Sequence, residues 1–354
     1  MGSGHGGNVE EIARKYNIDE KSIIDFSANI NPLGLSNSVK EEIIKAIDKV
    51  ERYPDITYFN LKKAISKYEN VKEDSIILGN GAAEVIFNIC RGLKPQKACL
   101  IAPSFIEYED ALKSVNSEID YYILQEDFII KEDFLNSINN DLDIIFICNP
   151  NNPTGVLTSK DFLIKVLEKG VETNTAIVID ESFLDFVENK NDFTTINIVD
   201  KFKNLIVVKS LTKFFAFPGI RIGYAITANK EYIKAINKVA VSWNVNTLAN
   251  FGAIKALSEK QYISDTILYV KKENKYLYNS LKEFEDIILY KGEVNFMFFK
   301  CLKTIDLKEE LIKKGILIRE CNNYKGLDKG YYRVAVRKRH ENEMLIKALK
   351  EVLQ

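Results

Sequence analysis

The strongest constraint on the fold is a series of short apolar runs, each closed by a cluster of polar residues. These runs lie at residues 98–101, 143–148, 176–179 and 205–208. Runs of this length, separated by segments of helical length, are typical of buried strands that alternate with helices. Such alternation predicts an α/β protein with a mostly parallel sheet. Ligands bind at the carboxyl ends of the strands in these sheets, which is where the polar clusters fall.

The length of the chain predicts more than one structural unit. Its 354 residues exceed the usual size of a single hydrophobic core, so a large domain and a smaller one are expected. After residue 226 the composition shifts to lysine-rich helical segments, and the end of the chain mixes strand-like and helical runs. We therefore expect an N-terminal arm with part of the small domain at 1–40, a large domain at 41–250, and a small α+β domain at 251–354.

Composition and charge argue against several classes of function. The formal net charge is −1 and no basic stripe occurs, so neither nucleic acid nor an anionic membrane is an expected partner. No apolar run approaches the ~20 residues of a membrane span, and the first residues lack the layout of a secretory signal, so a cytoplasmic protein is expected. The cysteines show no C-x-x-C spacing, which predicts reduced thiols. With only two histidines, His5 and His340, no histidine-rich metal site is expected.

The segment 210–221 carries the most informative polar cluster. It directly follows an apolar run and holds two hydroxyls, Ser210 and Thr212, beside Lys213, with Arg221 farther along. Hydroxyls and a forked guanidinium suit a phosphate, and a lysine beside them suits a Schiff base with an aldehyde. This combination indicates pyridoxal 5′-phosphate (PLP). The alternative is that Lys213 and Arg221 are solvated charges flanking a loop.

Three further residues after predicted strands suit the same cofactor. Asp180 ends a buried run, and a buried carboxylate needs a positive partner such as a protonated pyridine nitrogen. Asn152 lies in a proline-rich turn, where its amide could donate to the ring oxygen, and Phe105 offers a face for stacking. The ordinary alternatives are a helix cap or ion pair for Asp180, a turn-forming role for Asn152, and a place in the core for Phe105. A glycine turn at 79–84 leads into a predicted helix, whose free N–H groups form a candidate anion site.

The residues 152–155, Asp180, 210–213 and Arg221 resemble, in order and spacing, the fold-type I PLP-dependent transferases, in the branch that contains histidinol-phosphate aminotransferase. The resemblance implies a mostly parallel central sheet in a large PLP-binding domain, with a smaller α+β domain. It also implies that Lys213 is the Schiff-base lysine and that Asp180 pairs with the pyridine nitrogen.

The same resemblance implies the other cofactor contacts. They are Ala82, Ala83, Phe105, Asn152, Ser210, Thr212 and Arg221. The backbone of the two alanines, the two hydroxyls and the arginine would hold the cofactor phosphate. Tyr53 would reach the cofactor phosphate of the partner subunit, which implies a homodimer. The chain departs from the aminotransferase pattern at Phe183, where a tyrosine usually donates to the ring oxygen.

The stretches 5–8, 25–34 and 318–337 resemble the threonine-phosphate decarboxylases, and this resemblance runs essentially from end to end. It implies PLP-dependent decarboxylation of L-threonine O-3-phosphate to (R)-1-aminopropan-2-yl phosphate, for cobalamin biosynthesis. The implied substrate contacts are His5, Asn31, Asn152, Arg319, Arg333 and Arg337. Separate arginines suit such a substrate because they could bind its phosphate and its carboxylate at different points. The alternative is that these arginines form surface ion pairs.

Three other functions stay open at this point. Histidinol-phosphate aminotransferase is the main rival among enzymes. Phosphoserine decarboxylation, giving ethanolamine phosphate, differs only by one methyl group, which is typically worth ~1–3 kcal/mol. A module that binds PLP as a sensor without catalysis is the third, although no DNA-binding segment or basic face accompanies it and both Lys213 and Asp180 are present.

Overall fold

A computed structural model of the chain describes residues 6–353, which form three sheets packed with helices. The largest is a seven-stranded sheet with the order β2-β8-β7-β6-β5-β3-β4. Its strands are β2 (Ile76–Gly79), β3 (Lys97–Ala102), β4 (Glu118–Ile123), β5 (Ile144–Cys148), β6 (Ala176–Asp180), β7 (Leu205–Ser210) and β8 (Gly223–Ile226). All neighbouring pairs are parallel except the two that involve β8. The predicted α/β fold with a mostly parallel sheet is confirmed.

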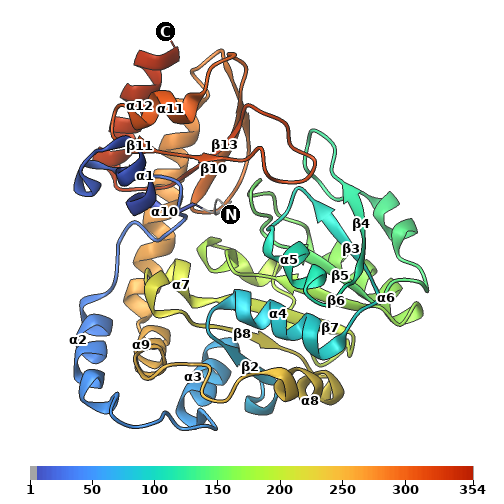
Figure 1. Ribbon diagram of the computed structural model, residues 1–354. Coiled ribbons are helices and arrows are strands. Elements are labelled where there is room, and N and C mark those ends of the chain that lie inside the picture. The colour runs from blue at the N-terminus through green and yellow to red at the C-terminus, as the bar shows by residue number, and fades with distance from the viewer. Residues whose placement is uncertain (1–5, 354) are drawn as a thin grey trace.

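Helices cover both faces of this sheet, which explains why its central strands are continuous apolar runs. Along β5, Ile144 and Phe146 pack into one buried cluster, and Ile145 and Ile147 pack into the cluster on the opposite face. The first face carries α4 (Ala82–Leu93), α5 (Glu107–Lys113) and α8 (Lys230–Val239), and the second carries α3 (Phe59–Glu69) and α6 (Lys160–Glu172). Figure 1 shows α4 crossing in front of the sheet, with α8 at its lower edge.

A smaller part of the molecule is built from both ends of the chain. Its four-stranded antiparallel sheet has the order β12-β13-β10-β9. The strands are β9 (Ile287–Tyr290), β10 (Phe296–Cys301), β12 (Arg319–Glu320) and β13 (Tyr331–Ala335). Near the amino terminus, β1 (Ile24–Asp25) pairs in parallel with β11 (Ile316–Leu317). Residues 24–25 therefore lie beside the C-terminal part of the chain, while the domain limits at 40 and 250 stay predictions.

The remaining helices connect and cover these sheets. They are α1 (Val9–Tyr16), α2 (Asn37–Ala46), α7 (Leu211–Phe214), α9 (Thr247–Leu257), α10 (Lys260–Leu281), α11 (Leu307–Ile312) and α12 (Arg339–Leu353). The long helix α10 runs from α9 up to the small sheet (Figure 1). Within residues 6–353, no helix combines the length and the apolar character needed to cross a bilayer.

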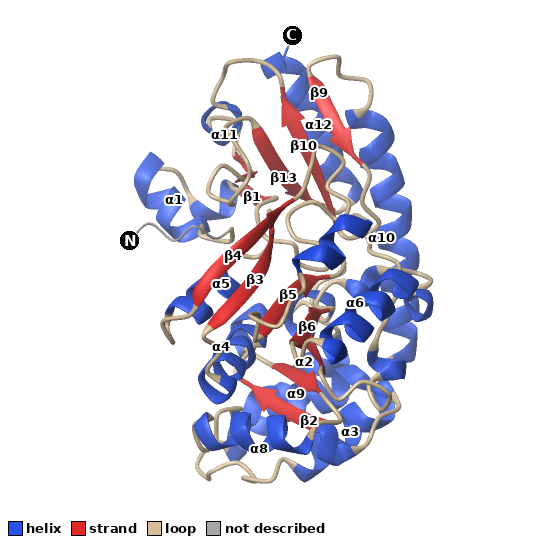
Figure 2. Ribbon diagram, turned by 90° about the vertical axis from the view of Figure 1, so that its right-hand side faces the viewer, coloured by secondary structure: helices blue, strands red, loops and turns tan. Residues whose placement is uncertain are grey.

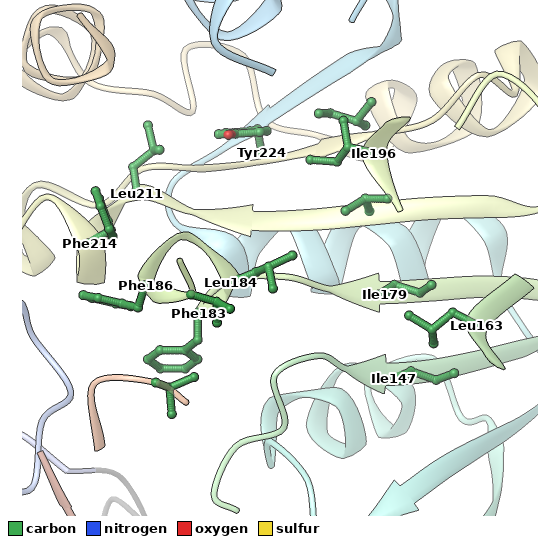
Figure 3. Packing of buried hydrophobic residues seen from close by; sticks show 14 of the residues in the cluster. Ile147, Leu163, Ile179, Phe183, Leu184, Phe186, Ile196, Leu211, Phe214 and Tyr224 are labelled. Atoms are coloured by element: carbon green, nitrogen blue, oxygen red, sulfur yellow. The ribbon is translucent and has the colours of Figure 1, made fainter. Parts of the chain in front are cut away.

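A buried apolar cluster supports the carboxyl edge of the large sheet. Leu211 and Phe214 of α7 pack in the same cluster as Phe183, Leu184 and Phe186, which follow β6. In Figure 3, these side chains gather beyond the ends of the strands that carry Ile147 and Ile179. The loops after β6 and β7 are therefore held by packing, and the polar side chains on them have fixed positions. In Figure 2, the small sheet lies above the large sheet.

Candidate active site

A cavity of about 570 Å³ lies where the carboxyl edge of the large sheet meets the small sheet. Most of the residues predicted from the sequence line it. They are Ala82, Ala83, Phe105, Asn152, Asp180, Lys213, Arg221, Arg319 and Arg333. Phe183 lines the cavity as well, with its ring edge-on to Phe296 at 5.2 Å between ring centroids. The position at which aminotransferases usually carry a tyrosine hydroxyl is therefore apolar here.

Lys213 lies on α7, the single helical turn that directly follows β7. Its Nζ donates to Ser210 Oγ at 3.2 Å. Burial lowers the pKa of Lys213 to about 8, although the charge of Asp180 opposes this shift. A lysine with this pKa is about one-tenth neutral amine at pH 7, far more than an ordinary lysine, which makes Lys213 a candidate nucleophile.

Asp180 is a buried carboxylate at the end of β6. Its Oδ1 accepts from the backbone N–H of Ser182 at 2.9 Å, and its Oδ2 accepts from the hydroxyl of Tyr108 at 2.7 Å. The buried ion pairs of residues 6–353 join Lys209 and Lys190 to Asp185 and Lys209 to Glu69, and none of them involves Asp180. A buried carboxylate with hydrogen bonds but no cation suits a positively charged ligand group.

The guanidinium of Arg221 lies next to the free N–H groups at the amino terminus of α4. Gly81 has φ +91°, and a Cβ at this position would lie 2.5 Å from Nη2 of Arg221, so glycine lets the guanidinium approach the helix. The N–H groups of Ala82 and Ala83 open the helix and have no partner within it. Because the helix dipole adds positive potential at the same point, this corner of the cavity suits a phosphate.

Ser210 and Thr212 lie beneath this corner and are not among the residues that line the cavity. Both are buried, and their hydroxyls are 2.9 Å apart. Ser210 also accepts from Lys213, so the structure brings the two predicted hydroxyls next to the lysine.

Arg333 on β13 is a buried cation that faces the cavity. One guanidinium nitrogen, Nη1, donates to Asn152 Oδ1, and Nη2 donates to the carbonyl of Ser27 at 2.9 Å. Its Nε has no hydrogen-bond partner, and no carboxylate among residues 6–353 forms an ion pair with it. A buried guanidinium in this setting suits an anionic ligand group.

Arg319 lies next to Arg333, because the two residues are directly paired across β12 and β13. Side chains of paired residues lie on the same face of a sheet, so both guanidinium groups reach the cavity. Arg319 donates to Asn323 at 2.7 Å and lies over the ring of Tyr324, 5.4 Å from its centroid. The small sheet thus supplies two neighbouring positive charges to a cavity whose other wall is the large sheet.

Three predicted residues lie away from the cavity, and one lies outside the described part of the chain. Tyr53 is 81% exposed and stacks on Trp243 at 4.6 Å between ring centroids. Arg337 forms an ion pair with Glu341 at 2.7 Å, as the surface alternative predicted. Asn31 donates to Phe214, Tyr262 and Thr266 instead of lining the cavity. His5 falls outside residues 6–353.

Asn29 is a cavity residue that the sequence analysis missed. It is buried and lines the cavity, and neither polar atom of its side chain has a hydrogen-bond partner in the described part of the chain. The sequence offered two asparagines two residues apart, and only the structure shows that Asn31 anchors the loop. Tyr108 was also missed, although its position three residues after Phe105 is the spacing of neighbours on a helix.

The fold and the cavity together define the class of protein. A lysine after one parallel strand, a buried carboxylate after its neighbour and a helix amino terminus beside an arginine form the site of an α/β enzyme with the aminotransferase fold. Residues 21–349 match the family described as aminotransferase class I and II, and the chain belongs to that family.

Individual relatives narrow this assignment. The chain is 37% identical to a threonine-phosphate decarboxylase of Salmonella typhimurium, over 99% of this chain and 97% of that protein. It is 34% identical to a bifunctional protein of adenosylcobalamin biosynthesis from Leptospira interrogans, over 98% of this chain and 41% of that protein. The crystal structure of the histidinol-phosphate aminotransferase from Clostridium acetobutylicum is similar, with a TM-score of 0.88 and 35% identity over 92% of this chain and 98% of that one. The resemblance predicted from the sequence is confirmed.

Proposed function

We propose that the chain is a PLP-dependent decarboxylase that converts L-threonine O-3-phosphate to (R)-1-aminopropan-2-yl phosphate for cobalamin biosynthesis. The observation that carries the proposal is a single cavity with a reactive lysine, a buried carboxylate and three arginines, Arg221, Arg319 and Arg333. One arginine suits the cofactor phosphate, and the other two suit a substrate with two anionic groups. Similarity to a threonine-phosphate decarboxylase and to a cobalamin-biosynthesis protein supports the same reaction and pathway.

The residues of the cavity fit PLP. Lys213 is a partly neutral amine that would bind the cofactor covalently, and Asp180 would face the ring nitrogen. Asn152 can donate its amide N–H to the ring oxygen, because its Oδ1 already accepts from Arg333. Phe105 would stack on the ring, and the phosphate would lie at the amino terminus of α4 with Arg221, above Ser210 and Thr212. When bound, PLP supplies an electron sink for the bond that breaks at the substrate's α-carbon.

The arginines of the small sheet would orient the substrate. Arg333 would bind the carboxylate, and Arg319 would bind the phosphate, with the unpartnered amide of Asn29 as a further contact. Two separate anchors hold the α-carbon in one orientation and therefore select the bond that breaks. The protonated form of Lys213 would deliver a proton to the α-carbon once carbon dioxide has left, and this leaves the neutral amine.

A homodimer would complete the site. Ile44, Ile47, Val50 and Tyr53 are exposed apolar side chains at intervals of three residues, and Tyr53 contacts the exposed Trp243; we call these five residues the exposed apolar face. Contiguous exposed apolar surface usually marks an interface. Covering this face with a second copy would bury Tyr53, and we propose that its hydroxyl reaches the cofactor phosphate in the partner subunit.

The direct test is product analysis with the purified chain and PLP. We expect carbon dioxide and aminopropanol phosphate from phosphothreonine, with no requirement for a keto acid. A requirement for 2-oxoglutarate, together with amino transfer from histidinol phosphate, would instead support the rival aminotransferase. Phosphoserine as the preferred substrate, giving ethanolamine phosphate, would retain the reaction type and change the substrate.

A further inference from the structure

Tyr108 is a buried tyrosine behind the cavity wall, in contact with two cavity residues, and the proposed mechanism leaves it without a role. It lies on α5, and its hydroxyl donates to Asp180 Oδ2 at 2.7 Å. Its ring stacks on Phe146 of β5 at 5.1 Å between ring centroids and meets Phe105 edge-on at 5.6 Å. Tyr108 therefore contacts both the proposed acid for the ring nitrogen and the proposed stacking residue.

The hydroxyl of Tyr108 donates directly to the buried carboxylate of Asp180. A hydrogen bond donated to a carboxylate stabilises its charge, and this matters most where burial removes water. Burial raises the pKa of Tyr108 well above its usual range, so the hydroxyl keeps its proton and remains a donor. Burial also raises the pKa of the nearby Cys148 thiol to about 12, and its Sγ donates to the carbonyl of Pro150 at 3.3 Å. The hydroxyl of Tyr108 and the N–H of Ser182 are thus the donors to Asp180 within residues 6–353.

We propose that Tyr108 is a positioning residue that keeps Asp180 ionised, so that the proton shared between Asp180 and the cofactor ring nitrogen stays on the nitrogen. This inference rests on the proposed function, because it needs PLP in the cavity. A protonated ring nitrogen withdraws electrons more strongly than a neutral one. The hydroxyl would therefore act on the step in which the α-carbon bond breaks and not on substrate binding.

The test is Tyr108→Phe, which removes the hydroxyl and leaves the ring packed between Phe105 and Phe146. The matched control is Tyr224→Phe. Tyr224 is a fully buried tyrosine whose hydroxyl also donates to a carboxylate, that of Glu69, but it lies in the cluster on the opposite face of the sheet, away from the cavity (Figure 3). Both variants lose one buried hydroxyl, so a purely structural effect should be similar in the two.

Three quantities are measured on wild type and both variants: kcat, KM for phosphothreonine, and the ¹⁵N resonance of PLP labelled at the ring nitrogen. In Tyr108→Phe we expect kcat to fall roughly tenfold, since a hydrogen bond to a charged group is lost, with KM nearly unchanged. We expect the ¹⁵N resonance to move toward that of unprotonated pyridine. Tyr224→Phe should leave all three quantities at their wild-type values.

An unchanged ¹⁵N resonance in Tyr108→Phe would overturn the inference, whatever happens to kcat. The proposed function would still stand in that case, provided that the wild type is active. The same shift in both variants would also overturn it, because the effect would then be structural. Failure of the wild-type chain to bind PLP would overturn the proposed function and this inference together.

Discussion

The reactivity of Lys213 follows from where its side chain is buried. An ordinary lysine has a pKa near 10.4 and is almost entirely protonated at neutral pH. Burial lowers the pKa of Lys213 to about 8, and only the neutral amine can attack an aldehyde. The environment therefore prepares this residue for covalent binding before any ligand arrives.

We expect the rate of PLP incorporation into the apoenzyme to rise with pH and to level off above pH 8. The sign follows from the lowered pKa, because the amine loses its proton as the pH passes through that value. The measurement is the growth of visible absorbance after mixing apoenzyme with PLP. Lys213→Ala is the control and should retain no cofactor after borohydride reduction and denaturation. A rate that still increases up to pH 10 would show that Lys213 behaves as a solvated lysine.

Asn29 and Asn31 are a natural pair for separating binding from stability. The amide of Asn31 donates to three buried acceptors, and its Oδ1 accepts from the N–H of Leu33 at 2.9 Å. We expect Asn31→Ala to lower the free energy of unfolding by about 1–3 kcal/mol. We expect Asn29→Ala to unfold like wild type but to raise KM for phosphothreonine by about tenfold. Denaturant unfolding and steady-state kinetics on both variants check this. If Asn29→Ala lowers the stability and leaves KM unchanged, Asn29 does not belong to the substrate site.

Whether the sequence could identify a site residue depended on how far its chemistry limits its role. A lysine beside two hydroxyls after a buried strand has few other uses, so Lys213 could be predicted. Asn29 and Asn31 have the same side chain and the same kind of neighbours, and what separates them is a set of contacts with α7 and α10 that are remote in the chain. The ion pair of Arg337 was easier to anticipate, because its partner Glu341 lies only four residues farther along the chain.

At the scale of elements, the apolar run was a reliable signal only for strands buried on both faces. β5, β6 and β7 are buried at every position, and the sequence showed each as a continuous apolar run. β4 lies at the edge of the sheet, and Glu118, Asp120 and other exposed or partly exposed side chains interrupt its pattern. β4 therefore does not stand out as an apolar run in the sequence, because water on one side removes the need for apolar residues.

The exposed face along α2 and the segment that follows it carries the prediction about assembly. We expect the wild-type chain to sediment as a dimer and Val50→Glu to sediment as a monomer, because a buried unpaired carboxylate opposes association. Val171→Glu on α6 is the control, since Val171 is a comparably exposed valine on a different helix. If Tyr53 reaches the partner site, the monomeric variant should also lose affinity for PLP. A wild-type chain that is monomeric and fully active would contradict the homodimer.

At the scale of the whole molecule, a buried ion cluster on the other side of β7 holds the loop after Asp180. Lys209 pairs with Asp185 at 2.8 Å, and Lys190 pairs with the same carboxylate at 2.6 Å. Asp185 belongs to the turn that follows Phe183, so the cluster anchors the end of the segment that carries the cavity residues Asp180 and Phe183. Lys209 directly precedes Ser210, so the cluster also anchors the strand that carries Lys213 toward the cavity.

We expect this cluster to govern how the free energy of unfolding decreases as the pH falls. Burial raises the pKa of Asp185, but Lys190 and Lys209 outweigh it and hold the pKa well below its usual range. A carboxyl with a lowered pKa stabilises the folded state above its unfolded pKa, near 3.9, and this contribution is lost as the pH falls toward the folded value.

We therefore expect Asp185→Asn to cost about 3–5 kcal/mol at pH 7, because it leaves the buried Lys209 and the partly buried Lys190 without their shared partner. Below about pH 4, where the wild type progressively loses the contribution of Asp185, we expect the difference between the two proteins to shrink. Urea unfolding of both proteins between pH 7 and pH 3 measures this. Asp200→Asn serves as the control, since Asp200 pairs with Lys72 at the surface, where such a pair contributes at most ~1 kcal/mol. If the difference in free energy of unfolding between wild type and Asp185→Asn stays constant with pH, the two lysines do not stabilise the ionised carboxylate of Asp185.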